Sequence, residues 1–372
     1  MLSCLRDPLN RQDINTLQRH NIYRMEFGIS TFGEIVPDHK AGNAVNAHKR
    51  VQELLEEAKL ADEIGLDVFA LGEHHRSDYV ISAPEMILAA AASITKNIKF
   101  ISAVTVLSSA DPVRVFQNFS TLDLISNGRA EIMAGRGSFI ESFPLFGYDL
   151  QDYDELFIEK LDLLLNINQH ERVNWKGTHR AAINNLGVYP RPYQPQLPIW
   201  IAVGGTPSSV VRAGSLNLPL TIAILGGSPV QFTSLTNLYR NAAKKAGHDV
   251  EKLQLCINEH LYIADSAEQA RDEFWVIYGK IMNKIGKERG WSPMTKQQFE
   301  YLCQPEGPLL VGDVKEVTEK LIYQYKLFNN TRFLAQIISG DIAHEKIMHS
   351  IELFGKEVVP AVKKGIATPI IL

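Results

Sequence analysis

The stretch VQELLEEAKLADEIGLDVFAL, residues 51–71, decides the fold because its apolar pattern changes once, from helical to extended. Its first part ends at Gly65 and carries apolar residues at helical spacing, at Val51, Leu54, Leu55, Ala58, Ala61 and Ile64. Residues 67–71 then form a short apolar run that is typical of a buried strand. Because residues 25–31 (MEFGIST) also predict a strand, the three segments together predict one strand–helix–strand unit.

The same alternation continues along the rest of the chain. Further strands are predicted at residues 98–107, 130–134, 199–203, 220–224, 253–263 and 332–338. The helices between them are predicted to span residues 112–125, 266–285 and 314–328. Others are predicted to begin near residues 84, 152 and 206 or to end near residues 247 and 359. Eight strands that alternate with at least eight helices favour closure of a parallel sheet over an open one. The sequence therefore predicts an α/β fold, a single (β/α)8 TIM barrel with insertions at its C-terminal mouth.

Two helix starts carry capping signals. Ser82, Pro84 and Glu85 predict an N-cap, a first-turn proline and a capping-box acid. Asp152 and Glu155 predict a second capping box.

The domain boundaries follow from where this pattern starts and stops. Residues 1–24 are polar and aperiodic, so we expect a loose N-terminal extension, or a start codon upstream of the true one at Met25. The barrel domain is expected over residues 25–364 and a short tail over residues 365–372. Two longer linkers, 171–198 and 286–308, are expected to cover the barrel mouth, and four prolines should keep the first one extended.

Composition excludes several classes of protein. The 372 residues carry a formal net charge of −4 and no long Lys/Arg block, which argues against a nucleic-acid partner and favours a small molecule. Three cysteines (Cys4, Cys256 and Cys303) are too few for a disulfide framework or a cysteine metal cage, as in a reducing cytosol. The longest aliphatic stretch, residues 86–92, is far below the roughly 18 residues that cross a bilayer. We expect a cytoplasmic protein without a membrane partner.

In a barrel of this kind, the active site lies where the strands end, and Gly72-Glu-His-His-Arg76 follows the strand that ends at Leu71. One interpretation is structural, with Glu73 or His75 capping the loop and one histidine hydrogen-bonded in the core. A metal site is disfavoured because adjacent side chains on an extended strand point to opposite faces. The favoured interpretation is one histidine that faces the mouth as a proton donor or acceptor.

Two further strand ends carry small residues. Ser102 and Ala103 interrupt a bulky strand, so either a flat ligand approaches the backbone there or a large neighbour packs against it, and the sequence favours packing. In Ala134-Gly-Arg-Gly-Ser138, two glycines flank Arg136, whose guanidinium could grip a phosphate or pair with Glu141.

A fourth strand end leads through Gly204 and Gly205 into a helix capped by Thr206. The free N–H groups of a glycine-rich helix start form an anion site, with Ser208 and Ser209 as additional donors. Together with Arg136 they suggest one phosphate held between neighbouring strand ends.

These motifs, in this order, resemble the bacterial luciferase-like monooxygenase superfamily over residues 25–364. The motifs that carry the resemblance are MEFG (25–28), GEHHR (72–76), SAVTVLSSADPVR (102–114), SNGRA (126–130), GRG (135–137), VYPRPYQ (188–194), PIWIAVGG (198–205) and HEK (344–346). Members of this family are single β/α barrels, typically homodimeric, that bind reduced FMN and in many cases react it with oxygen.

The resemblance implies a role for each candidate residue. It places the isoalloxazine ring over Ser102, Ala103 and Val104, with a cis peptide between the last two, and His74 as the catalytic residue near the ring. The residues implied to bind FMN, chiefly its phosphate, are Gly135, Arg136, Gly137, Gly204, Gly205, Thr206 and Ser208. No metal is implied. Luciferases proper have a cysteine where this chain has Gly135, which disfavours the light-emitting aldehyde reaction.

The leading functional hypothesis is an FMN-dependent oxidoreductase, a monooxygenase that receives FMNH2 from a separate flavin reductase, because no G-x-G-x-x-G unit for NAD(P)H is present. One alternative is an F420-dependent hydride-transfer enzyme, although the mildly acidic chain does not suggest a basic groove for the acidic F420 tail. A second alternative is a flavin-binding protein without turnover.

Overall fold

The structure is a computed structural model that describes residues 25–35, 43–137 and 139–367. Its main sheet closes into a barrel of parallel strands in which β12 pairs with β1, so that Glu26 lies opposite Arg332. The eight barrel positions are held by β1 (Glu26–Thr31), β2 (Val68–Leu71), β3 and β4 (Lys99–Ser102 and Thr105–Val106), β5 (Ala130–Gly135), β8 (Ile199–Val203), β9 (Leu220–Ala223), β10 (Leu255–Ile263) and β12 (Arg332–Gln336). All eight predicted strands are present, and the predicted (β/α)8 barrel is confirmed.

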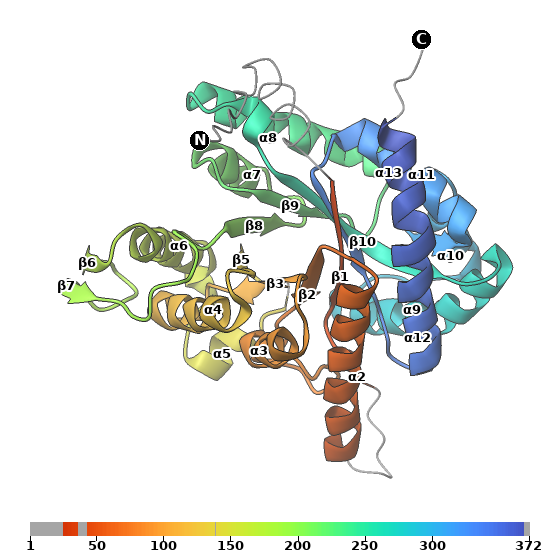
Figure 1. The fold of residues 1–372 in the computed structure, drawn as a ribbon, viewed down its shortest axis with the longest axis horizontal. Helices are drawn as coiled ribbons and strands as arrows, with labels where there is room; N and C mark the ends of the chain where they lie inside the picture. Colours follow the sequence, from red (N-terminus) through yellow and green to blue (C-terminus); the bar gives the residue numbers. More distant parts are fainter. Residues whose placement is uncertain (1–24, 36–42, 138, 368–372) are drawn as a thin grey trace, which may run out of the picture.

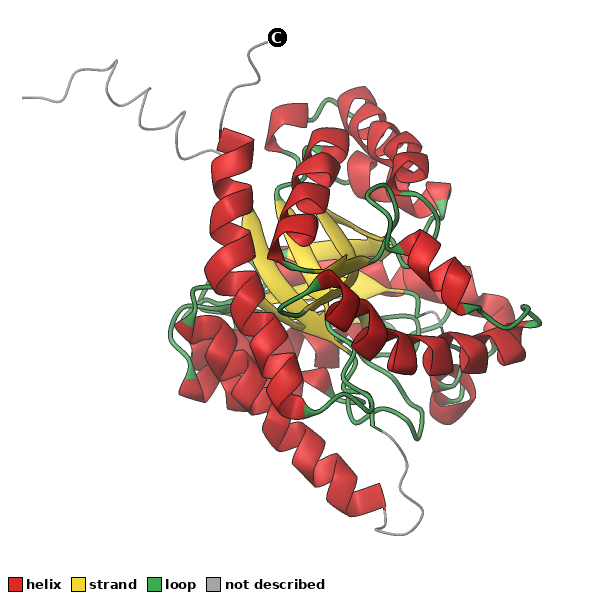
Figure 2. Ribbon diagram, turned by 90° about the vertical axis from the view of Figure 1, so that its right-hand side faces the viewer, coloured by secondary structure: helices red, strands yellow, loops and turns green. Residues whose placement is uncertain are grey.

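Helices cover the outside of these strands, and Figure 2 shows the strands gathered within a ring of helices. The helices are α2 (Asn43–Glu63), α3 (Pro84–Ile94), α4 (Pro112–Ser126), α5 (Ser142–Phe146), α6 (Tyr153–Gln169), α7 (Pro207–Ser215), α8 (Thr233–Lys245), α9 (Ala267–Arg289), α10 (Lys296–Leu302), α11 (Val314–Phe328), α12 (His344–Leu353) and α13 (Val359–Ala367). No helix among the described residues is both long and apolar enough to cross a membrane.

Both predicted capping boxes are wrong. Ala83, not Ser82, holds the N-cap position of α3, and no side chain caps that helix, although Pro84 is its first residue as predicted. Asp152 holds the N-cap position of α6 without a side-chain hydrogen bond. The reason is that Asp149 already caps a short 3-10 turn, Leu150–Asp152, which leads directly into α6.

The two long linkers contain elements of their own. Residues 171–198 include the hairpin of β6 (Arg172–Trp175) and β7 (Ile183–Gly187), which lies beside α6 (Figure 1). Residues 286–308 include the end of α9 and all of α10. The first linker holds no helix, as its prolines predicted. Neither linker lines the cavity at the mouth, although Glu288 of the second linker pairs with Arg76 in the loop after β2. The segment that follows β5, which includes α5, lines it instead.

The barrel interior holds one small apolar cluster: Val68, Ala70, Ile101, Met133, Trp200, Cys256 and Leu334. At the opposite end from the mouth, the buried Arg332 donates to Glu131 at 2.6 Å and to Glu26 at 2.6 Å. Burial raises the pKa of Glu131, but Arg332 outweighs it and holds that pKa below its usual range. The ion pairs close this end of the barrel.

Three sequence expectations concern the chain ends and the cysteines. The predicted extension, residues 1–24, and Cys4 lie outside the described residues. Helix α13 continues to Ala367, three residues into the predicted tail, and residues 368–372 are not described. Cys256 and Cys303 are buried and unpaired, and burial raises the pKa of each thiol to about 12, as expected of structural thiols.

Candidate active site

A cavity of about 310 Å3 opens where the barrel strands end. Its lining comes from the segments after β1, β2, β3 and β5 and from residues of β8, β9, β10 and β12. Most of the predicted site residues line it, namely His74, Ala103, Val104, Gly135, Arg136, Gly137 and Gly204. Ser102, Gly205, Thr206 and Ser208 do not.

The floor of the cavity is the break between β3 and β4. The Ala103–Val104 peptide is cis, as the resemblance implied, and Ala103 N donates to Leu71 O at 2.7 Å. A Cβ on Gly135 would lie 2.7 Å from the Val104 side chain, so a glycine there lets β5 approach the break closely. The floor is therefore flat backbone with small side chains.

Ser102 lies under this floor instead of in the cavity. The side chain is fully buried, and its Oγ accepts hydrogen bonds from Thr105 Oγ1 at 2.8 Å and from Met133 N at 3.2 Å. Its hydroxyl thus joins β3, β4 and β5.

Glu73 ties the loop after β2 to the same break. One carboxylate oxygen accepts from Val106 N at 2.8 Å, and the other lies 2.7 Å from His75 Nε2. The Glu73 amide also donates to Val104 O at 3.3 Å. Glu73 and His75 therefore hold the position of the floor, which corresponds to the capping interpretation of these two residues.

His74 and His75 both line the cavity, but the two rings have different neighbours. Its ring packs against Phe32, Tyr79 and Phe139 at centroid distances of 4.5, 4.6 and 5.0 Å. Burial, with a further contribution from Arg76, lowers the pKa of His74 to about 4, so the imidazole is neutral at pH 7. Its Nε2 is buried without a hydrogen-bond partner among the described residues. A neutral ring with a free nitrogen can exchange a hydrogen bond with a bound molecule.

Arg136 lies at the outer edge of the cavity, beside the start of α7. Its guanidinium donates to Asp154 and, at 2.7 Å, to Thr206 Oγ1. The sequence alternative of a pair with Glu141 is wrong, because Glu141 pairs with Arg76 at 2.8 Å.

Among the described residues, no side chain caps the start of α7, whose first residue, Pro207, has no N–H, so the N–H groups of Ser208 and Ser209 face the open end of the helix. Thr206 is the N-cap residue, as predicted, but its side chain makes no cap hydrogen bond. Gly204 and Gly205 are exposed, and a Cβ at either would meet nothing within 4 Å. Open space, free N–H groups and an adjacent arginine together make an anion site.

The motifs did not name several residues of the site, among them Thr221 on β9, Asn258 on β10, and Leu334 and Gln336 on β12. They line the cavity because alternate residues of each barrel strand point inward. The alternation within these strands was the only signal for them, and it does not distinguish a lining residue from a core residue.

The cavity has the features that a bound flavin would use. Besides His74 Nε2, the Gln336 Oε1 atom is buried without a hydrogen-bond partner among the described residues. Such orphaned atoms are costly unless a ligand or water meets them. With the flat floor and the anion site at its edge, the cavity suits a ring system that carries a phosphate.

Comparison with known proteins gives the family. The model of the luciferase-like monooxygenase family matches residues 25–327, so this chain belongs to that family. The oxygenase component of a flavin-dependent trigonelline monooxygenase from Acinetobacter baylyi is 25% identical and covers 83% of this chain and 89% of its own length. Limonene 1,2-monooxygenase from Rhodococcus erythropolis is 26% identical, with coverages of 90% and 87%.

Solved structures share the fold. The oxygenating constituent of 3,6-diketocamphane monooxygenase from Pseudomonas putida, in complex with FMN, has a TM-score of 0.71, with 22% identity over 90% of this chain and 98% of its own. An F420-dependent secondary alcohol dehydrogenase also has a TM-score of 0.71, with 18% identity over 91% and 99%. At these identities, the likeness concerns the fold alone.

Proposed function

We propose that this protein is an FMN-dependent monooxygenase that uses oxygen to oxidise a small organic substrate. The proposal rests on one observation. At one edge of the cavity, Arg136 and the uncapped start of α7 lie beside the flat floor at Ala103–Val104, and His74 lines the same cavity. Membership of the luciferase-like monooxygenase family and the flavin-dependent relative support the same cofactor.

In this proposal, each group of residues has one task. Arg136 and the N–H groups at the start of α7 bind the phosphate, with Gly204, Gly205, Thr206 and Ser208 shaping that turn. Ala103, Val104, Gly135 and Gly137 give the ring a flat surface, and Ser102 supports it from below. The bound FMN, when reduced, supplies the electrons with which oxygen is activated.

His74 is the proposed catalytic residue. Because its ring is neutral at pH 7, it acts as a hydrogen-bond donor or acceptor at the reacting centre and not as a cationic acid. The rings of Phe32, Tyr79 and Phe139 around it exclude water from that place.

The reduced flavin is proposed to come from a separate flavin reductase, because the chain lacks the G-x-G-x-x-G unit expected for NAD(P)H. The relative from Acinetobacter baylyi is likewise named an oxygenase component. The protein is further proposed to act in the cytoplasm as a homodimer.

Rapid mixing tests the proposed function. Anaerobic protein loaded with reduced FMN is mixed with oxygenated buffer, and the absorbance spectrum is followed. We expect a transient spectrum that differs from those of both reduced and oxidised FMN, with a lifetime longer than that of free reduced FMN under the same conditions. Selective binding of F420 over FMN, with substrate oxidation that needs no oxygen, would establish the hydride-transfer alternative. Tight FMN binding without any effect on its reaction with oxygen would establish the carrier alternative.

A further inference from the structure

A second cavity of about 240 Å3 lies next to the first, on the other half of the barrel mouth. It is bounded by the segments after β1, β2 and β12 and by one side of α9 (Figure 1). Phe139 lines both cavities.

One layer of rings separates the two cavities. His74 lines the first and Tyr79 lines the second, and their ring centroids are 4.6 Å apart. Phe139 completes the layer, at 5.0 Å from His74 and 6.4 Å from Tyr79. A molecule in the second cavity would therefore lie against the ring wall that packs on His74.

The basic side chains that line the second cavity are already neutralised. Arg76 pairs with Glu141 at 2.8 Å and with Glu288 at 2.6 Å. Lys284 pairs at 2.6 Å with Asp78, which also lines the cavity.

A fourth ion pair completes this neutralisation. Lys280 and Asp341, both of which line the cavity, pair at 2.5 Å. An ionic ligand would have to compete with these pairs for its partner, which reduces its gain in free energy relative to that of a neutral ligand.

The remaining acid, Glu34, is buried and accepts hydrogen bonds at 3.4 Å from Thr31 Oγ1 and from Ser339 N. Burial raises the pKa of Glu34, which favours its uncharged form. It can offer a polar contact without requiring a cation.

The wall that α9 contributes is apolar. Ile277, Ile281 and Ile285 recur every four residues, so they form one stripe of the helix, and all three line the cavity. Apolar surface of this kind gains free energy when an apolar molecule displaces water from it.

We infer that this second cavity holds the organic substrate, and that the substrate is an uncharged, mainly apolar molecule. The inference rests on the proposed monooxygenase function, and it adds the class of substrate and the place where it binds. The ring layer of His74, Tyr79 and Phe139 then places the bound substrate directly beside the flavin cavity.

Three probes with one ring frame test the charge class: naphthalene-1-methanol, 1-naphthoate and 1-naphthylmethylammonium. Their binding to the full-length protein saturated with FMN is measured by titration calorimetry. The neutral probe should bind at least about tenfold more tightly than either ion, a difference that such titrations resolve readily. Tightest binding of either ion, or no binding of the neutral probe up to about 1 mM, would overturn the inference.

A pair of α9 variants tests the place. Ile281→Trp fills the cavity and should weaken binding of the neutral probe at least about tenfold. Val276→Trp, on the same helix, adds an equal ring at a position that is 53% exposed and should leave probe binding unchanged. Unchanged probe affinity in Ile281→Trp would refute the location.

FMN affinity is measured on the same samples and should be the same in both variants, because neither residue lines the first cavity. Failure of the wild-type protein to bind FMN would refute the proposed function instead. The two failures are thereby distinguished.

Discussion

Arg136 is the side chain on which the anion site depends most directly. Removing a charged hydrogen bond to phosphate typically costs about 1.5 to 3 kcal/mol, so Arg136→Ala should bind FMN roughly ten- to a hundredfold more weakly. Riboflavin, which lacks the phosphate, should bind the variant and the wild type equally. Flavin fluorescence titrations measure both affinities, with Arg172→Ala on the β6–β7 hairpin as the surface control. Equal FMN affinity in the wild type and Arg136→Ala would show that Arg136 does not bind the phosphate.

His74 carries a prediction about pH as well as rate. His74→Ala should shorten the lifetime of the oxygen-dependent transient by a factor of about 10² to 10⁴, as acid–base groups typically supply, and should change FMN affinity little. Because the pKa of His74 is about 4, it stays neutral above about pH 5. The wild-type and variant profiles between pH 6 and 9 should therefore be parallel.

The control for His74 must allow for the role of its neighbour. His75 holds Glu73 at 2.7 Å, and Glu73 holds the cavity floor, so His75→Ala is expected to weaken FMN binding more than His74→Ala does. If the lifetimes of the transient in His74→Ala and in the wild type converged near neutral pH, His74 would titrate there, and its surroundings would be more polar than the three rings around it.

At the scale of single residues, the sequence located the site well. Strand ends with glycines, a histidine pair and an arginine are local signals, and the structure brings His74, Ala103, Gly135, Arg136 and Gly204 to one cavity. The side-chain orientations were not predictable, because they depend on contacts between distant segments. The pair of Arg136 with Thr206, 70 positions away in the chain, is one example.

At the scale of elements, periodicity predicted every barrel strand, because a strand buried on both faces is an uninterrupted apolar run. The two capping boxes failed for a different reason. A cap depends on the path by which the chain enters the helix, and the turn at Asp149 changed that path for α6. The β6–β7 hairpin was missed because its strands are short and largely exposed, and so lack an apolar pattern.

Strand β10 carries a prediction about acid stability. His260 is buried against Tyr278, with ring centroids 5.7 Å apart, and burial lowers its pKa to about 4. In the unfolded chain the pKa returns to about 6.5, so the unfolded state takes up the proton first as the pH falls. The stability that neutral His260 contributes is complete above pH 6.5 and is lost as the pH falls toward 4.

His260→Leu should remove this part of the acid sensitivity. Between pH 7 and 4.5, the free energy of unfolding of the variant should fall by about 2 kcal/mol less than that of the wild type, measured by urea denaturation. His349→Leu is the control, since His349 is exposed on α12 and paired with Asp265. Equal losses in the wild type and His260→Leu would show that His260 is already charged or solvated in the folded protein.

At the scale of the whole molecule, the two ends of the barrel differ in how their polar groups are paired. Arg332, Glu131 and Glu26 neutralise one another at the closed end, where their charges bind no ligand. At the mouth, His74 Nε2 and Gln336 Oε1 are left without partners. Because such buried atoms are costly unless a ligand or water meets them, those at the mouth favour binding there.

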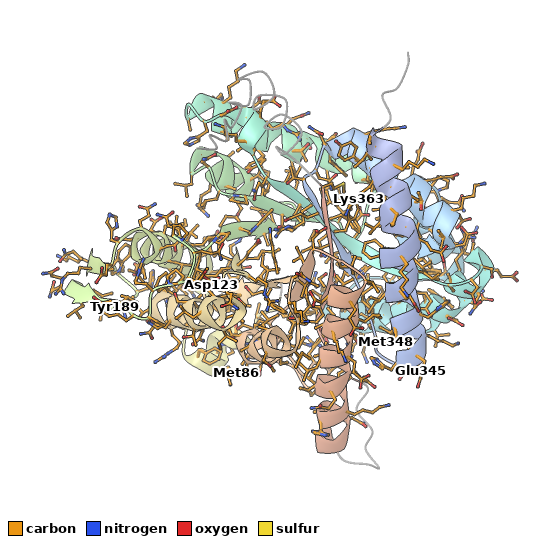
Figure 3. The ribbon with its side chains drawn as sticks, viewed as in Figure 1. Met86, Asp123, Tyr189, Glu345, Met348 and Lys363 are labelled. Atoms are coloured by element: carbon orange, nitrogen blue, oxygen red, sulfur yellow. The ribbon has the colours of Figure 1, made fainter. Side chains whose placement is uncertain are left out.

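One of the exposed apolar features of the outer surface is a patch on α3 and α4. Met86 is 73% exposed, and Ile94, Leu124 and Ile125 are 44 to 48% exposed. Met86 is labelled on α3 in Figure 3. Arg129 donates to Ala92 O and to Ser126 O, so the C-terminal ends of the two helices lie together, with Ile94 near Leu124 and Ile125. Apolar surface gathered on two adjacent helices is typical of an interface between subunits.

This patch is the expected interface of the proposed homodimer. Sedimentation equilibrium of the wild type should give twice the 41.7 kDa chain mass. A stable dimer buries about 800 Å2 on each partner, and a buried unpaired carboxylate opposes such burial strongly. Met86→Glu combined with Leu124→Glu should therefore give a monomer, whereas Val276→Glu, exposed on α9, should remain dimeric. The monomeric variant should keep its FMN affinity, since neither residue lines the cavity. A monomeric wild type at about 10 μM, or a double variant that stays dimeric, would exclude this interface.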